Sequence, residues 1–155
     1  MDPGTKTLGF GLIEPTGRGS AKLHECGVIR TDAKLDLWLR LEELYDGVTE
    51  VVERFRPSTM AIETIFHGKN TRSALSLAHA RGVILLVAAK HNLAVREFAP
   101  ASIKQAITGS GQASKDQVAY MLQKLLRLQA PPTPADAADG VAVALTSIIK
   151  SRNGL

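Results

Sequence analysis

The segment Thr59-Met60-Ala61-Ile62-Glu63 decides the fold class, because a short apolar stretch lies there between two longer helical patterns. Before it, apolar residues recur at helical spacing over residues 37–55, which predicts an amphipathic helix that ends ahead of Pro57. After it, residues 71–90 have the length and composition of a second helix. A buried strand enclosed by two helices indicates an α/β fold.

Shorter patterns on both sides extend this alternation of strands and helices. Residues 8–13 and 22–31 are predicted to form a hairpin, and residues 93–98 a further strand. Three more helices are predicted from start signals at Pro100, Ser114 and Thr133. The resulting order predicts a mixed central sheet flanked by helices, within a single domain of residues 1–155.

The composition is that of a globular protein with a basic balance. The formal net charge of +4 permits a polyanionic partner without requiring one. Cys26 is the single cysteine, so no internal disulfide forms, which favours a reducing cytoplasm. The longest apolar run, residues 82–89, is shorter than the roughly 20 residues that cross a bilayer, so no membrane partner is expected.

The cover of the first two helices is a separate question. Trp38 and Tyr45 lie beside the apolar stripe of the first helix and are expected in the core. The later half of the helix over residues 71–90 is apolar on nearly all sides, so both of its faces need cover. The sequence leaves two explanations open: both faces of this helix are buried in the core of the same chain, or a second subunit covers one of them.

Four carboxylates stand at positions that call for an explanation. Asp2 precedes a turn at Gly4, Glu63 closes the buried strand, and Asp136 and Asp139 share one face of the last predicted helix. Asp136 by itself fits a helix cap, but Asp139 and Glu63 each need a cation or a hydrogen-bond donor if buried. Convergence of these acids would form an oxygen-rich Mg²⁺ site, and two ions about 4 Å apart suit phosphodiester hydrolysis. The residues alone predict a metal-dependent phosphotransfer enzyme.

A series of motifs runs along nearly the whole chain. They are Asp2-Pro3-Gly4-Thr5 with Gly9-Phe10-Gly11, Ala61-Ile62-Glu63-Thr64-Ile65-Phe66 with Asn70 and Ser73-Ala74-Leu75, Ala80-Arg81-Gly82-Val83, residues 104–111 with Ala113 and Lys115, and Asp136-Ala137-Ala138-Asp139. In this order, and in a chain of this length, they resemble the RuvC family of crossover junction endodeoxyribonucleases, which resolve Holliday junctions. The resemblance implies an RNase H-like fold.

The resemblance also implies a catalytic centre. Its metal-binding and catalytic acids would be Asp2, Glu63, Asp136 and Asp139. The implied cofactor is Mg²⁺, with Mn²⁺ as a substitute and two ions in each subunit. Lys104 and Lys115 match family lysines that act near the scissile phosphate.

The implied substrate is a four-way DNA junction, cut in recombination and repair in the bacterial cytoplasm. A homodimer would nick two opposed strands symmetrically, next to a branch-migration complex of the RuvA and RuvB type. Phe66 matches an aromatic residue at the junction centre, where it would stack on an exposed base. His67, Lys69 and Arg72 follow it and favour a loop that faces DNA.

One departure from the family concerns the start of the sequence. Family members normally have a short apolar strand that leads to the first aspartate, whereas Met1 directly precedes Asp2 here. Either the first strand is missing or the sequence begins late, and Asp2 is expected to be poorly held. About five added apolar residues are expected to raise thermal stability and cleavage.

Three alternatives stay open on the sequence alone. The first is a junction-binding protein of the same fold that cuts weakly or not at all. The second is an actin-like ATP-binding module, because Asp2-x-Gly4-Thr5 is similar to the first phosphate loop of such proteins. The third is an RNase H-like nuclease that acts on RNA or on a simple duplex.

Overall fold

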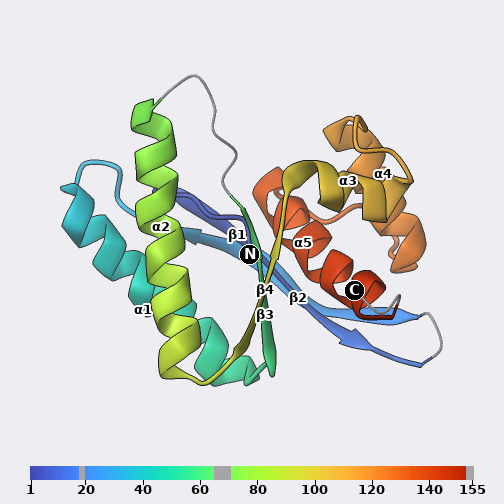
Figure 1. Ribbon diagram of the computed structural model, residues 1–155, viewed down its shortest axis with the longest axis horizontal. Helices are drawn as coiled ribbons and strands as arrows, with labels where there is room; N and C mark the ends of the chain where they lie inside the picture. The colour runs from blue at the N-terminus through green and yellow to red at the C-terminus, as the bar shows by residue number, and fades with distance from the viewer. Residues whose placement is uncertain (18–19, 65–70, 153–155) are drawn as a thin grey trace.

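The strands and helices follow the predicted order in a computed structural model, which describes residues 1–17, 20–64 and 71–152 (Figure 1). They are β1 (Thr7–Pro15), β2 (Ala21–Arg30), α1 (Leu37–Phe55), β3 (Thr59–Glu63), α2 (Thr71–Lys90), β4 (Ala94–Phe98), α3 (Pro100–Thr108), α4 (Lys115–Leu125) and α5 (Ala135–Arg152). None of these described helices is long and apolar enough to cross a membrane.

The strands form two pairs that the first two residues join. β1 and β2 are antiparallel, whereas β3 and β4 are parallel. Asp2 forms an antiparallel bridge with Gly9 of β1, and the Asp2 N–H donates to the Gly9 carbonyl at 2.9 Å. On the other side, the amino group of Met1 donates to the Ala61 carbonyl at 2.5 Å, and the Glu63 N–H donates to the Met1 carbonyl at 3.1 Å. Met1 and Asp2 therefore lie between β1 and β3, and the expectation that Asp2 is poorly held was wrong.

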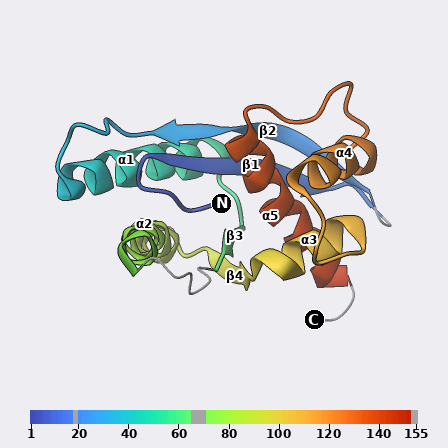
Figure 2. The ribbon, with the colours of Figure 1, turned by 90° about the horizontal axis from the view of Figure 1, so that it is seen from above.

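Helices cover both sides of the strands, which confirms the α/β class. Figures 1 and 2 show α1 and α2 on one side and α3, α4 and α5 on the other. One core cluster includes Leu8, Leu44 and Ile62, all fully buried, and packs against α2. The other is centred on α5, where Val141 and Val143 are fully buried. The strands are thus held between two apolar layers.

The outer surfaces of α1 and α2 differ from the prediction. Tyr45 packs against the core as expected, but Trp38 is 66% exposed, so its predicted burial was wrong. Trp38 lies in the first turn of α1, before that helix reaches the strands. On α2, Leu75 and Leu86 are more than half exposed. Within residues 1–17, 20–64 and 71–152, the chain therefore covers only one face of α2.

A groove continues the line of the Met1–Asp2 segment between β1 and β3. Its volume is about 830 Å³, and its walls come from β1, β3, the end of α1 and the second half of α5. Phe10, Ile13, Val52, Met60 and Ile148 contribute apolar surface to it. Met1 forms hydrogen bonds with β3, and Asp2 forms hydrogen bonds with β1. At that end, the gap between β1 and β3 therefore has the width of a single strand.

An apolar extension ahead of Met1 is expected to fill this groove. About five residues, the length of one strand, would hydrogen bond to the free edges of β1 and β3 and bury their side chains. We expect the melting temperature to rise by at least about 5 °C and junction cleavage to increase. The measurement is thermal unfolding beside a Gly/Ser extension of equal length. Equal melting temperatures for the two extended proteins would contradict the prediction.

Candidate metal centre

Three of the four predicted acids converge. Asp2, Asp136 and Asp139 each offer a carboxylate oxygen, and these oxygens lie within 4.8 Å of one another. Asp2 comes from the segment between β1 and β3, whereas Asp136 and Asp139 come from the first turns of α5. Residues at opposite ends of the sequence thus form one cluster of oxygen ligands.

Contact between the backbones of β1 and α5 produces this convergence. A Cβ atom at Gly9 would lie 1.7 Å from the carbonyl oxygen of Asp136, and one at Gly140 would lie 2.5 Å from the Gly9 carbonyl carbon. Only glycine fits at either position. Since Asp2 pairs with Gly9, the approach of α5 to Gly9 brings its two aspartates to Asp2.

Sequence reasoning did not single out Gly140, although a signal was present. A glycine inside a helix costs about 1 kcal/mol relative to alanine, so its presence there suggests a packing reason. Gly140 directly follows Asp139 within α5. An acid next to such a glycine points to a helix that approaches another backbone closely.

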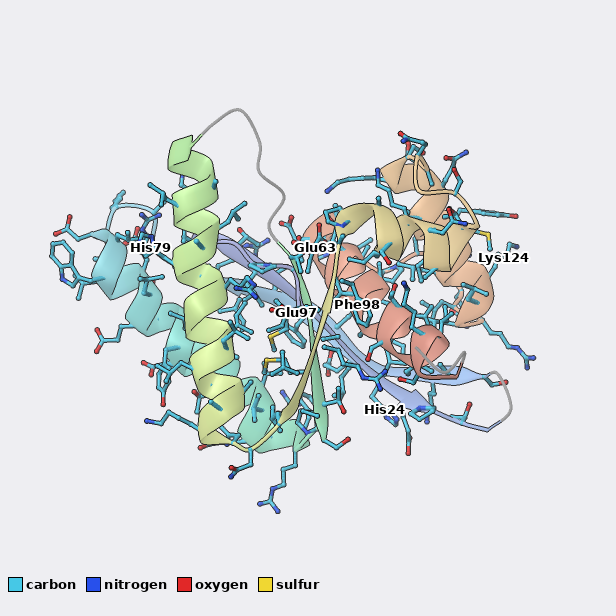
Figure 3. The ribbon with its side chains drawn as sticks, in the orientation of Figure 1. His24, Glu63, His79, Glu97, Phe98 and Lys124 are labelled. Carbon is cyan, nitrogen blue, oxygen red and sulfur yellow. The ribbon has the colours of Figure 1, made fainter. Side chains whose placement is uncertain are left out.

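Glu63 is the last residue of β3 (Figure 3), close enough to Asp2 and Asp139 for their charges to act on it. Burial raises the pKa of Glu63 to about 7, and the charges of Asp2 and Asp139 add to this shift. Burial likewise raises the pKa of Asp2 to about 6, with the Asp139 charge as the next cause. The four acids therefore repel one another when ionised.

This set of ligands fits a divalent cation. The donors are all carboxylate oxygens, which Mg²⁺, Mn²⁺ and Ca²⁺ prefer over sulfur or imidazole. A divalent charge among them would offset both the repulsion and the cost of burial. The raised pKa values are thus what a metal centre is expected to show when the carboxylates have no cation.

Lys115, for which the resemblance implies a role near the scissile phosphate, also reaches the cluster. Its Nζ donates to Oδ2 of Asp139 at 2.7 Å, and this hydrogen bond raises the pKa of Lys115. The lysine begins α4, directly after a capping box in which the Ser114 and Gln117 side chains bond each other's backbone N–H groups. Its side chain is 73% exposed, so the ammonium approaches the acids from the solvent side.

Of the remaining predicted residues, the structure describes only the side chain of Lys104. Lys104 is half-buried on α3, and among the described side chains it makes no hydrogen bond or ion pair with the acids. Phe66, His67 and Lys69 lie outside the described residues, as does the side chain of Arg72. Their predicted contacts with DNA stay predictions.

The fold and the acidic cluster define an RNase H-like protein of the nuclease type. A family model described as "Crossover junction endodeoxyribonuclease RuvC" matches residues 1–147. The chain belongs to this family, which confirms the resemblance inferred from the motifs.

Individual relatives agree with the family model. A crossover junction endodeoxyribonuclease RuvC of Moorella thermoacetica is 47% identical over 146 residues, which are 94% of this chain and 86% of the relative. That of Cronobacter sakazakii is 44% identical over 153 residues, or 99% of this chain and 87% of the relative.

Solved structures confirm the RNase H-like fold. The Thermus thermophilus RuvC structure has a TM-score of 0.90 and 34% identity, and it covers 99% of this chain and 93% of that chain. T. thermophilus RuvC in complex with a Holliday junction substrate has a TM-score of 0.92 and 33% identity, with the same coverage.

Proposed function

We propose that this protein is a structure-selective endonuclease that resolves Holliday junctions by hydrolysing phosphodiester bonds in two opposed strands. The observation that carries the proposal is the convergence of Asp2, Asp136 and Asp139 in a chain of the RuvC family. A whole-chain match to a relative described in complex with a junction substrate supports the same substrate. The activity would serve recombination and repair of DNA in the bacterial cytoplasm.

The four acids are proposed to hold the metal and carry catalysis. Asp2, Asp136 and Asp139 would bind Mg²⁺ directly, and Glu63 would complete the site for a second ion; Mn²⁺ has the same ligand preference. When bound, the metal supplies activation of the attacking water and stabilisation of the leaving oxygen. Asp2, Asp136 and Asp139 would direct this chemistry to one phosphate, because the close contact of β1 with α5 fixes their positions.

Lys115 is proposed to act on the phosphate itself. Its exposed ammonium lies at the open side of the cluster, where a DNA backbone would approach. The Lys115 ammonium carries three N–H donors and makes one hydrogen bond to Asp139, so it could also donate to a phosphate oxygen. Lys104 is proposed as a second phosphate contact from the neighbouring α3.

A homodimer is proposed to match the symmetry of the junction. The exposed face of α2 carries Leu75, Ala78, His79, Gly82 and Leu86, an apolar stripe at helical spacing that a second copy could cover. Two copies related by a twofold axis would bring two metal centres to two opposed strands. The predicted loop with Phe66, His67 and Lys69, and Arg72 at the start of α2, would then face the junction, and RuvA- and RuvB-type proteins would be the partners.

The test uses a synthetic four-way junction and a linear duplex of matched sequence, each with Mg²⁺ or with EDTA. Asp139→Asn is the inactive variant, and Asp46→Asn, which replaces an exposed acid of α1, is the matched control. We expect paired, symmetric nicks in the junction alone, in Mg²⁺ alone, and in the wild type and Asp46→Asn only.

Other outcomes separate the alternatives. Tight junction binding without cutting would indicate a binding protein of the same fold. Equal cutting of duplex or RNA would indicate a different RNase H-like nuclease. Protection from heat unfolding by ATP would indicate a nucleotide-binding module.

A further inference from the structure

A hydrogen bond joins α2 to the loop that follows Asp2. The hydroxyl oxygens of Thr5 and Ser76 are 2.8 Å apart, and either can be the donor. Thr5 is only 8% exposed, one of the few buried polar residues among those described. A buried hydroxyl without a partner is costly, so this contact ties the loop to the helix.

The same loop is held from its other side by the residue after β2. The Thr31 hydroxyl donates to the Thr5 carbonyl at 2.7 Å, and the Thr31 N–H donates to the Lys6 carbonyl at 3.1 Å. Thr5 is therefore fixed through its side chain by α2 and through its backbone by Thr31. Of these two attachments of Thr5, only the hydrogen bond with Ser76 involves a side chain of α2.

The position of Thr5 bears directly on Asp2. The turn between them is tight, because a Cβ atom at Gly4 would lie 2.1 Å from the Thr7 carbonyl oxygen. Such a turn has little freedom to absorb a shift of Thr5 without moving Asp2. Ser76 itself is not one of the residues that offer a ligand oxygen to the acidic cluster.

We propose that Ser76 is a positioning residue for the metal centre, which fixes Asp2 through its hydrogen bond to Thr5. This inference rests on the proposed role of Asp2 as a metal ligand. Loss of the Ser76 hydroxyl leaves the four acids in place but loosens one of them. The metal affinity falls for that reason, while junction binding in the absence of metal does not change.

The test compares Ser76→Ala, Thr5→Val and their double variant with Ser76→Thr, which keeps a hydroxyl. Ser151→Ala is the matched control, because it also removes a serine hydroxyl bond, at the far end of α5. Calorimetric titration with Mn²⁺ in the absence of DNA gives the metal affinity. Junction binding in EDTA and the Mg²⁺ concentration for half-maximal cleavage are measured in parallel.

We expect Ser76→Ala and Thr5→Val each to weaken Mn²⁺ binding about three- to tenfold, the range that one lost hydrogen bond allows. The double variant should lose no more than either single variant, because one bond is broken in all three. Ser76→Thr and Ser151→Ala should retain the wild-type affinity. The Mg²⁺ requirement for cleavage should rise in parallel.

Two results would overturn the inference. Wild-type Mn²⁺ affinity in Ser76→Ala, or an equal loss in Ser151→Ala, would show that Ser76 has no specific effect on the centre. A wild-type protein that binds no Mn²⁺ would instead remove the metal centre itself, and the proposed function with it.

Discussion

Glu63→Gln is expected to lower the rate of junction cleavage at least about a hundredfold and, at the same time, to stabilise the metal-free protein. The amide keeps the size of the side chain but removes an anionic oxygen ligand. In the absence of metal, it also removes a part-buried charge that Asp2 and Asp139 repel. The gain should be about 1–2 kcal/mol, or roughly 2–8 °C in melting temperature, after allowance for partial solvent exposure.

The direction of the pH dependence tests the cause of this stabilisation. The pKa of Glu63 is about 7 in the fold against 4.5 ordinarily, so the folded protein keeps a proton that the unfolded chain releases. The metal-free wild type therefore loses stability as pH rises from 4.5 through 7. Calorimetric unfolding in EDTA should show no advantage of Glu63→Gln near pH 4.5 and the full advantage at pH 8. An advantage independent of pH would refute the electrostatic explanation.

Gly9→Ala is expected to destabilise the fold by about 3 kcal/mol or more and to abolish Mn²⁺ binding. The added methyl group would overlap the Asp136 carbonyl, and neither backbone can move without separating α5 from β1. The melting temperature should fall by roughly 6–12 °C. Gly140→Ala should act in the same way, because its methyl group would meet the backbone at Gly9 and Phe10.

Gly82→Ala is the matched control for this prediction. Like Gly140, Gly82 lies inside a helix, on the face of α2 that we propose meets a second copy, but a Cβ atom there would meet nothing within 4 Å among the described residues. Alanine should raise helix stability there by up to about 1 kcal/mol. Unfolding by urea measures all three variants. Equal effects at Gly9 and Gly82 would show that close packing of β1 on α5 is unimportant.

Local signals in the sequence predicted most of the elements. The apolar stripe of α1, Pro100 at the start of α3 and the Ser114–Gln117 capping box each act within one or two turns of the chain. Such signals need no tertiary information, so the predicted order of elements was confirmed. The prediction for Trp38 failed because a stripe defines a helix face but not where along its length the core ends.

The geometry of the site depends on contacts that spacing along the chain does not encode. Asp2 and Asp139 meet only because α5 packs on β1 at Gly9, and that contact joins the two ends of the sequence. The family motifs implied four acids, three of which the structure brings together, without showing how they meet. The bond between Thr5 and Ser76 could not be predicted either, because a threonine in a loop and a serine in a helix are common on any surface.

The order of β1 and α5 along the chain has a consequence for synthesis on the ribosome. Asp136 and Asp139 leave the ribosome long after Asp2, which lies part-buried between β1 and β3, strands that are made much earlier. The contact of β1 with α5 is of high sequence separation, so it forms late in folding. A nascent chain in which α5 has not yet been made therefore lacks Asp136 and Asp139, and the acidic cluster cannot form.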